Sequence, residues 1–82
     1  MVFEIIWSDS AARQLKKLDR SVARRIFGKV GELRENPHRY VQKLVNSPYY
    51  RLRVGDYRVV VDVQEASLRI LVLKVGRRES IY

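Results

Sequence analysis

Hydrophobic and polar residues follow two different periods along this chain, and the change of period marks the elements. Val2–Trp7 is a short apolar run of β-branched and aromatic residues, which predicts a strand. Behind it, Ala11, Leu15 and Leu18 recur at helical spacing, so they lie on one face of a predicted helix. The polar segment Ser8–Ser10 between the two patterns supplies typical N-cap residues for that helix.

A second helical pattern follows at once, with apolar positions at Val22, Ile26, Val30 and Leu33. Asp19 or Ser21 caps its start, and Pro37 ends it because the residue before a proline is pushed out of the α region. Gly28 and Gly31 weaken this helix by roughly 1 kcal/mol each relative to alanine, so close packing against a neighbour is expected there. The short connection predicts an antiparallel helical hairpin.

After an irregular segment bracketed by prolines, the period changes to that of strands. Tyr49–Val54 and Tyr57–Gln64 alternate, whereas Leu68–Val75 is nearly all apolar and predicts a central strand buried on both faces. The element order is therefore β-α-α-β-β-β. This order predicts an α+β fold in which the helical hairpin covers one face of a mostly antiparallel four-stranded sheet.

The loop Gly55-Asp56 also predicts how its two flanking strands pair. A two-residue loop sets Val54 against Tyr57, and it therefore sets Arg53 directly opposite Arg58. A longer loop with a bulge would instead move Arg58 to the other face. Because side chains alternate along a strand, the shorter loop places three arginines on the open face of the sheet: Arg51, Arg53 and Arg58.

These converging arginines are unfavourable for stability alone, since like charges opposite each other destabilise a sheet. One interpretation is a solvated polar face, on which arginine is tolerated. The simpler interpretation is a bound polyanion, because guanidinium groups match phosphate oxygens in a bidentate manner. The pattern therefore favours a phosphate-binding surface.

Composition supports this interpretation and excludes several others. The chain has 82 residues with 17 basic and 9 acidic side chains, which gives a formal net charge of +8 and favours a polyanionic partner. At this length we expect a single domain over residues 1–82. The absence of cysteine excludes disulfides, thiolate metal sites and cysteine nucleophiles. No apolar run approaches the ~18 residues of a membrane helix, and no signal peptide is evident. We therefore expect a cytoplasmic protein without a membrane partner.

The candidate chemistry is limited by the same composition. His38 is the only histidine, which excludes a two-histidine ribonuclease, and no carboxylates have the spacing of a metal site, so we expect no cofactor. RNA cleavage by attack of a 2′-hydroxyl on the adjacent phosphate remains open. Arginines stabilise the developing charge, by about 3 kcal/mol for one preorganised donor, but they are poor bases. Such a site needs a substrate that something else positions.

Several segments resemble the RelE/ParE toxin superfamily, and the RelE branch most. They are Leu18-Asp19 in the helical turn, residues 33–37, RLRVGDYRVV at 51–60 and VGRR at 75–78 with the final Tyr82. The resemblance covers essentially the whole chain. It implies a toxin of a type II toxin–antitoxin system that cleaves messenger RNA in the ribosomal A site, without metal, by 2′-hydroxyl attack.

The resemblance also implies roles for particular residues. The catalytic set that it implies is Arg51, Arg53, Arg58, Arg78 and Tyr82. The implied RNA-binding residues are Arg77, Lys16, Lys17, Arg24 and Arg25. The last four belong to residues 10–48, where ten basic and three acidic side chains lie. The implied partners are ribosomal RNA, messenger RNA and an acidic antitoxin that masks the site.

The chain departs from the family pattern at several positions. Arg51 and Arg53 stand where the family often has lysine, and Val61 stands where many members have tyrosine. The chain stops at Tyr82, so no C-terminal helix is expected. Two alternatives therefore stay open: a ParE-like toxin that inhibits DNA gyrase through protein contacts, and a catalytically inactive nucleic-acid-binding partner of an antitoxin. The arginine set favours the ribonuclease.

Overall fold

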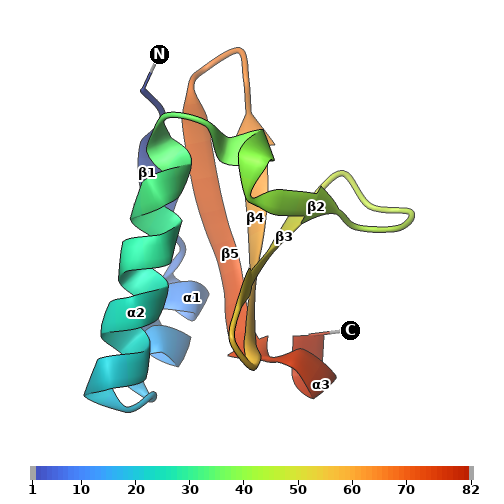
Figure 1. Cartoon of the computed structure of the whole chain (residues 1–82). Helices are drawn as coiled ribbons and strands as arrows, with labels where there is room; N and C mark the ends of the chain where they lie inside the picture. The colour runs from blue at the N-terminus through green and yellow to red at the C-terminus, as the bar shows by residue number, and fades with distance from the viewer. Residues whose placement is uncertain (1, 82) are drawn as a thin grey trace.

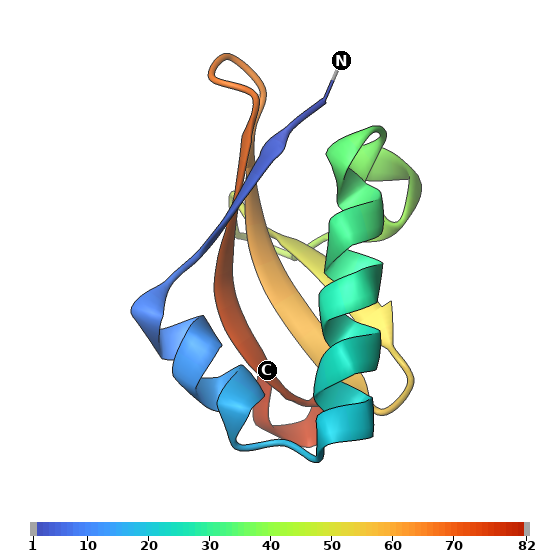
Figure 2. The same cartoon turned by 90° about the vertical axis from the view of Figure 1, so that its left-hand side faces the viewer.

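The computed structural model describes residues 2–81 and consists of one sheet with two helices against one of its faces (Figure 1, Figure 2). The strands are β1 (Glu4–Trp7), β2 (Val41–Lys43), β3 (Tyr50–Val54), β4 (Tyr57–Gln64) and β5 (Arg69–Arg77). The helices are α1 (Asp9–Lys16), α2 (Arg20–Gly31) and α3 (Arg78–Ile81), with 3-10 turns η1 (Glu32–Arg34) and η2 (Pro37–Arg39). The predicted α+β class is confirmed.

The sheet has five strands in the order β1-β5-β4-β3-β2, not the four that we predicted. β1 runs parallel to β5, and all other neighbouring pairs are antiparallel. The additional strand is β2, which lies in the segment that we expected to be irregular and pairs Val41 with Leu52 of β3. β2 is too short and too polar to show an alternating pattern, so only its pairing with β3 defines it.

The β3–β4 hairpin has the predicted register. Val54 pairs with Tyr57, Arg53 with Arg58, and Arg51 with Val60. Gly55 in the turn adopts a φ of +58°, a conformation that glycine reaches without the steric penalty of a side chain. The turn chemistry and the alternation of both strands therefore agree, and together they hold the arginines on one face.

The core lies between this sheet and the two long helices. Its largest fully buried side chains are Ile26, Leu33, Ile70, Val30, Val59, Val61 and Val72. Gln14 links α1 to β5, because its Oε1 accepts a hydrogen bond from the backbone N–H of Val75 at 2.7 Å. The β4–β5 ladder has a register shift at Val60/Val61, where one strand gains a residue over its neighbour.

Both long helices begin where the polar signals predicted. Ser8 caps α1: its Oγ accepts a hydrogen bond from the N–H of Ala11 at 3.0 Å and donates one to the carbonyl of Leu73 at 3.3 Å. Asp19 is the N-cap of α2, but its side chain makes no capping hydrogen bond. In Figure 2 the two helices diverge from their short connection across the same face of the sheet. None of the helices described within residues 2–81 could span a membrane.

Three local expectations were wrong. β5 is an interior strand but is buried on one face only, because the helices cover one side of the sheet and leave Arg69 and Lys74 exposed. A Cβ placed on Gly28 would have no heavy atom within 4 Å, so close packing does not explain this glycine. The chain also forms a C-terminal helical turn, α3, where we expected no helix.

Candidate functional site

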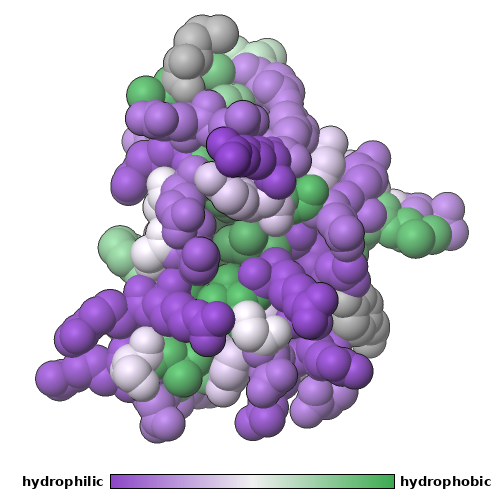
Figure 3. All heavy atoms as spheres, in the orientation of Figure 1, coloured by the Kyte–Doolittle hydropathy of each residue, from purple (hydrophilic) through white to green (hydrophobic). Residues whose placement is uncertain are grey.

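The face of the sheet opposite the helices carries a shallow groove of about 180 Å³. Its lining residues are Tyr40, Gln42, Arg51, Arg53 and Arg58. In Figure 3 hydrophilic residues dominate the surface in this region, and the projecting β2–β3 loop carries an exposed hydrophobic tip. The groove therefore combines three guanidinium groups with one amide and one phenol, and we call its surface the arginine face.

Strand register explains how these side chains come together. Arg53 and Arg58 face each other across β3 and β4, and Gln42 of β2 faces Arg51 of β3. Lys74 of β5 lies in the same cross-strand row as Gln42 and Arg51, because Lys74 pairs with Val60 and Val60 pairs with Arg51. The predicted convergence of the three arginines is confirmed, while their catalytic role stays a prediction.

Arg58 is the most firmly held of the three arginines. Only 7% of its surface is exposed, and its Nη1 donates hydrogen bonds to the carbonyls of Gly55 at 2.9 Å and Tyr57 at 2.8 Å. Hydrogen bonds from a charged donor are stronger than those between neutral groups. The β3–β4 turn therefore fixes the position of this guanidinium.

The other two arginines differ in exposure and in partners. Arg51 is half-buried, and its Nη2 donates to Oε1 of Gln42 at 2.7 Å. Arg53 is exposed. Within residues 2–81, no carboxylate forms an ion pair with Arg53 or Arg58. The positive charge of these two side chains is therefore available to an anion.

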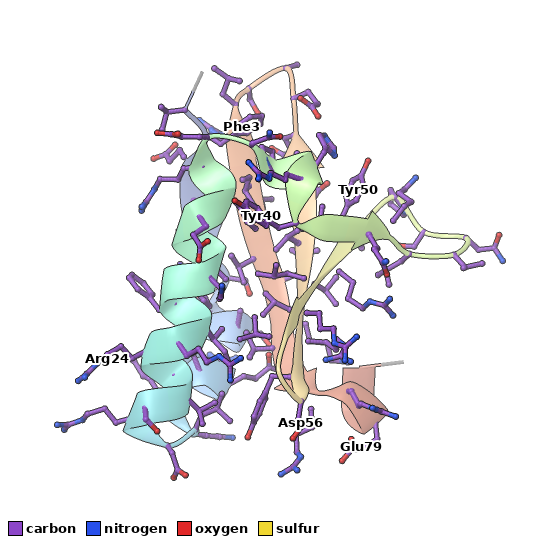
Figure 4. All side chains as sticks on the ribbon, in the orientation of Figure 1. Phe3, Arg24, Tyr40, Tyr50, Asp56 and Glu79 are labelled. Carbon is purple, nitrogen blue, oxygen red and sulfur yellow. The ribbon has the colours of Figure 1, made fainter. Side chains whose placement is uncertain are left out.

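The C-terminal arginines lie near the β3–β4 turn, but neither Arg77 nor Arg78 is among the residues that line the groove, and Arg77 pairs with Tyr57 on the opposite face of the sheet. The backbone N–H of Arg78 donates to the carbonyl of Asp56 at 3.0 Å, which brings α3 against the β3–β4 turn. Figure 4 shows Asp56 and Glu79 in this region. The guanidinium carbon of Arg77 lies 5.8 Å from the ring centroid of Tyr57, and its Nε is 3.5 Å from a carboxylate oxygen of Glu79. The candidate Tyr82 lies outside the described residues.

The basic residues of the helices form a different surface. Lys16 lies on α1, Lys17 lies directly after it, and Arg24 lies on α2, so all three are on the helix side of the sheet. Figure 4 shows Arg24 pointing away from the strands. Arg25 reaches the β3–β4 turn, where its Nη1 lies 3.2 Å from the position of a Cβ built on Gly55. The structure therefore does not bring the predicted RNA-binding residues of the helices into the groove.

Three polar residues on this side of the sheet were missing from the sequence prediction: Tyr40 and Gln42, which line the groove, and Lys74, which does not. The first two belong to the segment around β2, for which no strand was predicted. Lys74 was overlooked because β5 was taken as buried on both faces. The signal that could have found Gln42 is strand pairing: a third antiparallel strand beside β3 would place Gln42 opposite Arg51 and therefore on the same face.

The lining residues determine what the groove can do chemically. Guanidinium groups bind phosphate oxygens and stabilise negative charge that develops on them. His38 is not among the lining residues, because its Nε2 contacts Oε1 of Glu65 and its ring lies edge-on to Tyr50, 5.2 Å between centroids. Within the described part of the chain, no group of histidine, aspartate and glutamate side chains is placed to hold a metal ion. The groove therefore suits a phosphodiester held by electrostatics.

Comparisons with known sequences agree with the resemblance seen in the motifs. A family model described as the ParE toxin of the type II toxin–antitoxin system parDE matches residues 5–82. The chain is 31% identical over 83 residues to Toxin RelE of Mycobacterium tuberculosis, a match that covers 98% of this chain and 86% of the relative.

Solved structures share the same fold. The toxin–antitoxin complex RelBE2 of Mycobacterium tuberculosis contains a chain with a TM-score of 0.88 at 21% identity, covering 95% of this chain and all of that one. The archaeal RelE–RelB complex of Pyrococcus horikoshii contains a chain with a TM-score of 0.81 at 27% identity, covering 95% of this chain and 97% of that one. The likeness thus extends over nearly the whole molecule.

Proposed function

The chain belongs to the RelE/ParE superfamily of type II toxin–antitoxin toxins, and from this premise we propose that it is an endoribonuclease that cleaves messenger RNA in the ribosomal A site. The observation that carries this proposal is the convergence of Arg51, Arg53 and Arg58 in one groove. Three guanidinium groups around one hollow match the oxygens of a single phosphodiester.

The bonds that form and break in the proposed reaction all belong to the RNA. The 2′-hydroxyl oxygen attacks the neighbouring phosphorus, and the bond from phosphorus to the 5′-oxygen of the next nucleotide breaks. The products are a 2′,3′-cyclic phosphate and a 5′-hydroxyl, so the proton that the attacking oxygen loses is balanced by the one that the leaving oxygen gains. The arginines stabilise the charge on the phosphate oxygens during this exchange.

The ribosome has a specific part in this proposal. A guanidinium stays protonated and is a poor general base, so the groove supplies charge stabilisation but little proton transfer. Holding the RNA in the attack geometry makes the reaction effectively intramolecular and supplies much of the missing rate. We therefore expect slow or absent cleavage of free RNA and efficient cleavage of ribosome-bound messenger RNA.

An acidic antitoxin is the proposed partner in the resting cell. The formal net charge of +8 favours an acidic protein, and solved relatives of the same fold are RelE–RelB complexes. Occupation of the arginine face by carboxylates of such a protein would exclude phosphate. Binding also stabilises the toxin by mass action.

The test is to map messenger RNA 5′ ends in a reconstituted translation system with and without the purified protein. We expect ribosome-dependent cuts that Arg53→Ala abolishes and that the matched control Arg69→Ala retains. Arg69 is an exposed strand arginine as well, but it is not among the groove residues. Intact messenger RNA with the wild-type protein, or equal cleavage by Arg53→Ala, would overturn the proposal.

A second candidate is inhibition of DNA gyrase through protein contacts, and the ParE description of the matching family model favours it. A gyrase supercoiling assay with the same proteins separates the two functions. Inhibition of supercoiling that persists in Arg53→Ala, without any cleavage of messenger RNA, would establish the second candidate.

A further inference from the structure

Two of the five residues that line the groove are not arginines, and neither carries a charge that would bind phosphate. Tyr40 is the C-cap of η2, and Gln42 lies on β2, so both come from the one segment that folds beside β3. The groove is therefore chemically divided between guanidinium groups from β3 and β4 and a neutral pair from the η2–β2 segment.

The amide of Gln42 has a defined orientation. Arg51 donates to it at 2.7 Å, and a guanidinium has only donors, so the oxygen of the amide must face Arg51. The Nε2 group then faces elsewhere with two N–H donors. Within residues 2–81, the hydrogen bond from Arg51 to Oε1 is the one that the Gln42 side chain makes, so its Nε2 has no acceptor there. The groove thus presents neutral donors immediately beside the phosphate-binding charges.

The ring of Tyr40 is placed as an aromatic surface in the same groove. It is 44% exposed, and the guanidinium carbon of Arg39 lies 5.6 Å from its centroid. An exposed ring that lines a cationic groove is the usual platform on which proteins stack an unpaired nucleobase. Tyr40 and Gln42 therefore offer a stacking surface and a hydrogen-bond donor on the same side of the arginines.

We propose that Tyr40 and Gln42 form a nucleobase subsite, in which the base next to the cleaved phosphate stacks on Tyr40 and accepts a hydrogen bond from Nε2 of Gln42. This inference rests on the proposed function and adds the class of base. Guanine and uracil carry a carbonyl oxygen at the edge where adenine and cytosine carry an amino group. A donor at this position therefore selects keto bases over amino bases.

Because one amide supplies the hydrogen-bond donor, replacing that donor by an acceptor should reverse the preference for keto bases over amino bases. Gln42→Glu replaces two donors by acceptors and should favour the amino groups of adenine and cytosine. The matched control is Asn46→Asp, which adds the same negative charge in the β2–β3 loop, at a position with φ of 55° that aspartate also adopts. Asn46 is not among the groove residues.

The experiment uses a messenger RNA library with a randomised codon, programmed into translating ribosomes, and sequences the 5′ ends. For the wild-type protein we expect cleavage next to keto bases to exceed that next to amino bases by about fivefold or more. Gln42→Glu should invert the ratio, and Asn46→Asp should leave it unchanged. Tyr40→Ala should lower cleavage next to every base by about fivefold to a hundredfold, because stacking is tolerant of sequence.

Each result has one meaning. An inverted ratio in Gln42→Glu with an unchanged ratio in Asn46→Asp supports the subsite, whatever the absolute rates are. Cleavage by the wild-type protein without a preference between keto and amino bases, or the same ratio in Gln42→Glu, overturns the subsite and leaves the ribonuclease proposal intact. Absence of cleavage by the wild-type protein overturns both.

Discussion

Arg53 and Arg58 lie directly opposite each other across the β3–β4 hairpin, on the face of the sheet that the helices do not cover. Two like charges in this relationship destabilise a sheet by roughly 0.2–1 kcal/mol. Arg58 bonds to the carbonyls of the turn, whereas Arg53 is exposed. The pair therefore combines one structural arginine with one that contributes charge but little stability.

Replacing Arg53 should separate stability from function. Arg53→Thr removes the repulsion and introduces a residue with high strand propensity, so we expect the free energy of unfolding to rise by about 0.2–1 kcal/mol. Urea denaturation at low salt measures this gain, which should shrink at about 1 M salt because screening weakens the repulsion. The control Arg69→Thr has no opposing cation, since Arg69 pairs with Gln64 and lies 3.8 Å from a carboxylate oxygen of Glu4, so this replacement should not stabilise the protein. A less stable Arg53→Thr protein would contradict the prediction.

Replacing Arg58 should have the opposite effect on stability. Arg58→Ala removes two charge-assisted hydrogen bonds to the turn, so we expect the free energy of unfolding to fall by about 1.5–3 kcal/mol. The same denaturation assay measures the loss. A stability equal to that of the wild-type protein would show that the turn does not depend on this side chain. Loss of cleavage in Arg58→Ala alone would therefore not identify a catalytic role.

The two glycines Gly28 and Gly55 should respond in opposite ways to alanine. No atom lies within 4 Å of a Cβ at Gly28, so Gly28→Ala should raise the free energy of unfolding by about 1 kcal/mol through helix propensity. Gly55 has a φ of +58° and Arg25 lies 3.2 Å from the added Cβ, so Gly55→Ala should lower it by about 1–2 kcal/mol. Thermal and urea unfolding measure both. A destabilised Gly28→Ala protein would indicate packing that the structure does not contain.

The two helix N-caps should also differ. The side chain of Ser8 bonds to α1, whereas that of Asp19 makes no capping bond to α2. We expect Ser8→Ala to lower the free energy of unfolding by about 1 kcal/mol, a typical value for a bonded cap. Asp19→Ala is the control and should cost less, because only the interaction of its charge with the helix dipole is lost. Equal losses would mean that the bond at Ser8 adds nothing.

The hairpin register was predictable because two independent signals coincide there. Gly55-Asp56 specifies a short turn, and the alternation of apolar residues in both strands specifies which side chains face the core. The same argument placed the three arginines in one groove. The turn residues and the alternation within two neighbouring strands were therefore sufficient to predict this part of the site.

The missed parts depend on contacts between distant segments. β2 has only three residues, and its pairing with β3 rather than its own pattern makes it a strand, so Tyr40 and Gln42 could not be placed. The exposure of Lys74 depends on which face of β5 the helices cover. The open space beside Gly28 is likewise a property of the assembled fold.

The parallel pairing of β1 with β5 has a consequence for how the protein folds during synthesis. Glu4 pairs with Arg69, and the segments between them include both long helices and three of the strands. β1 is made first but finds its hydrogen-bonding partner only after β5 emerges, and contacts between segments so far apart form slowly. A nascent chain therefore lacks its complete sheet until translation has passed β5.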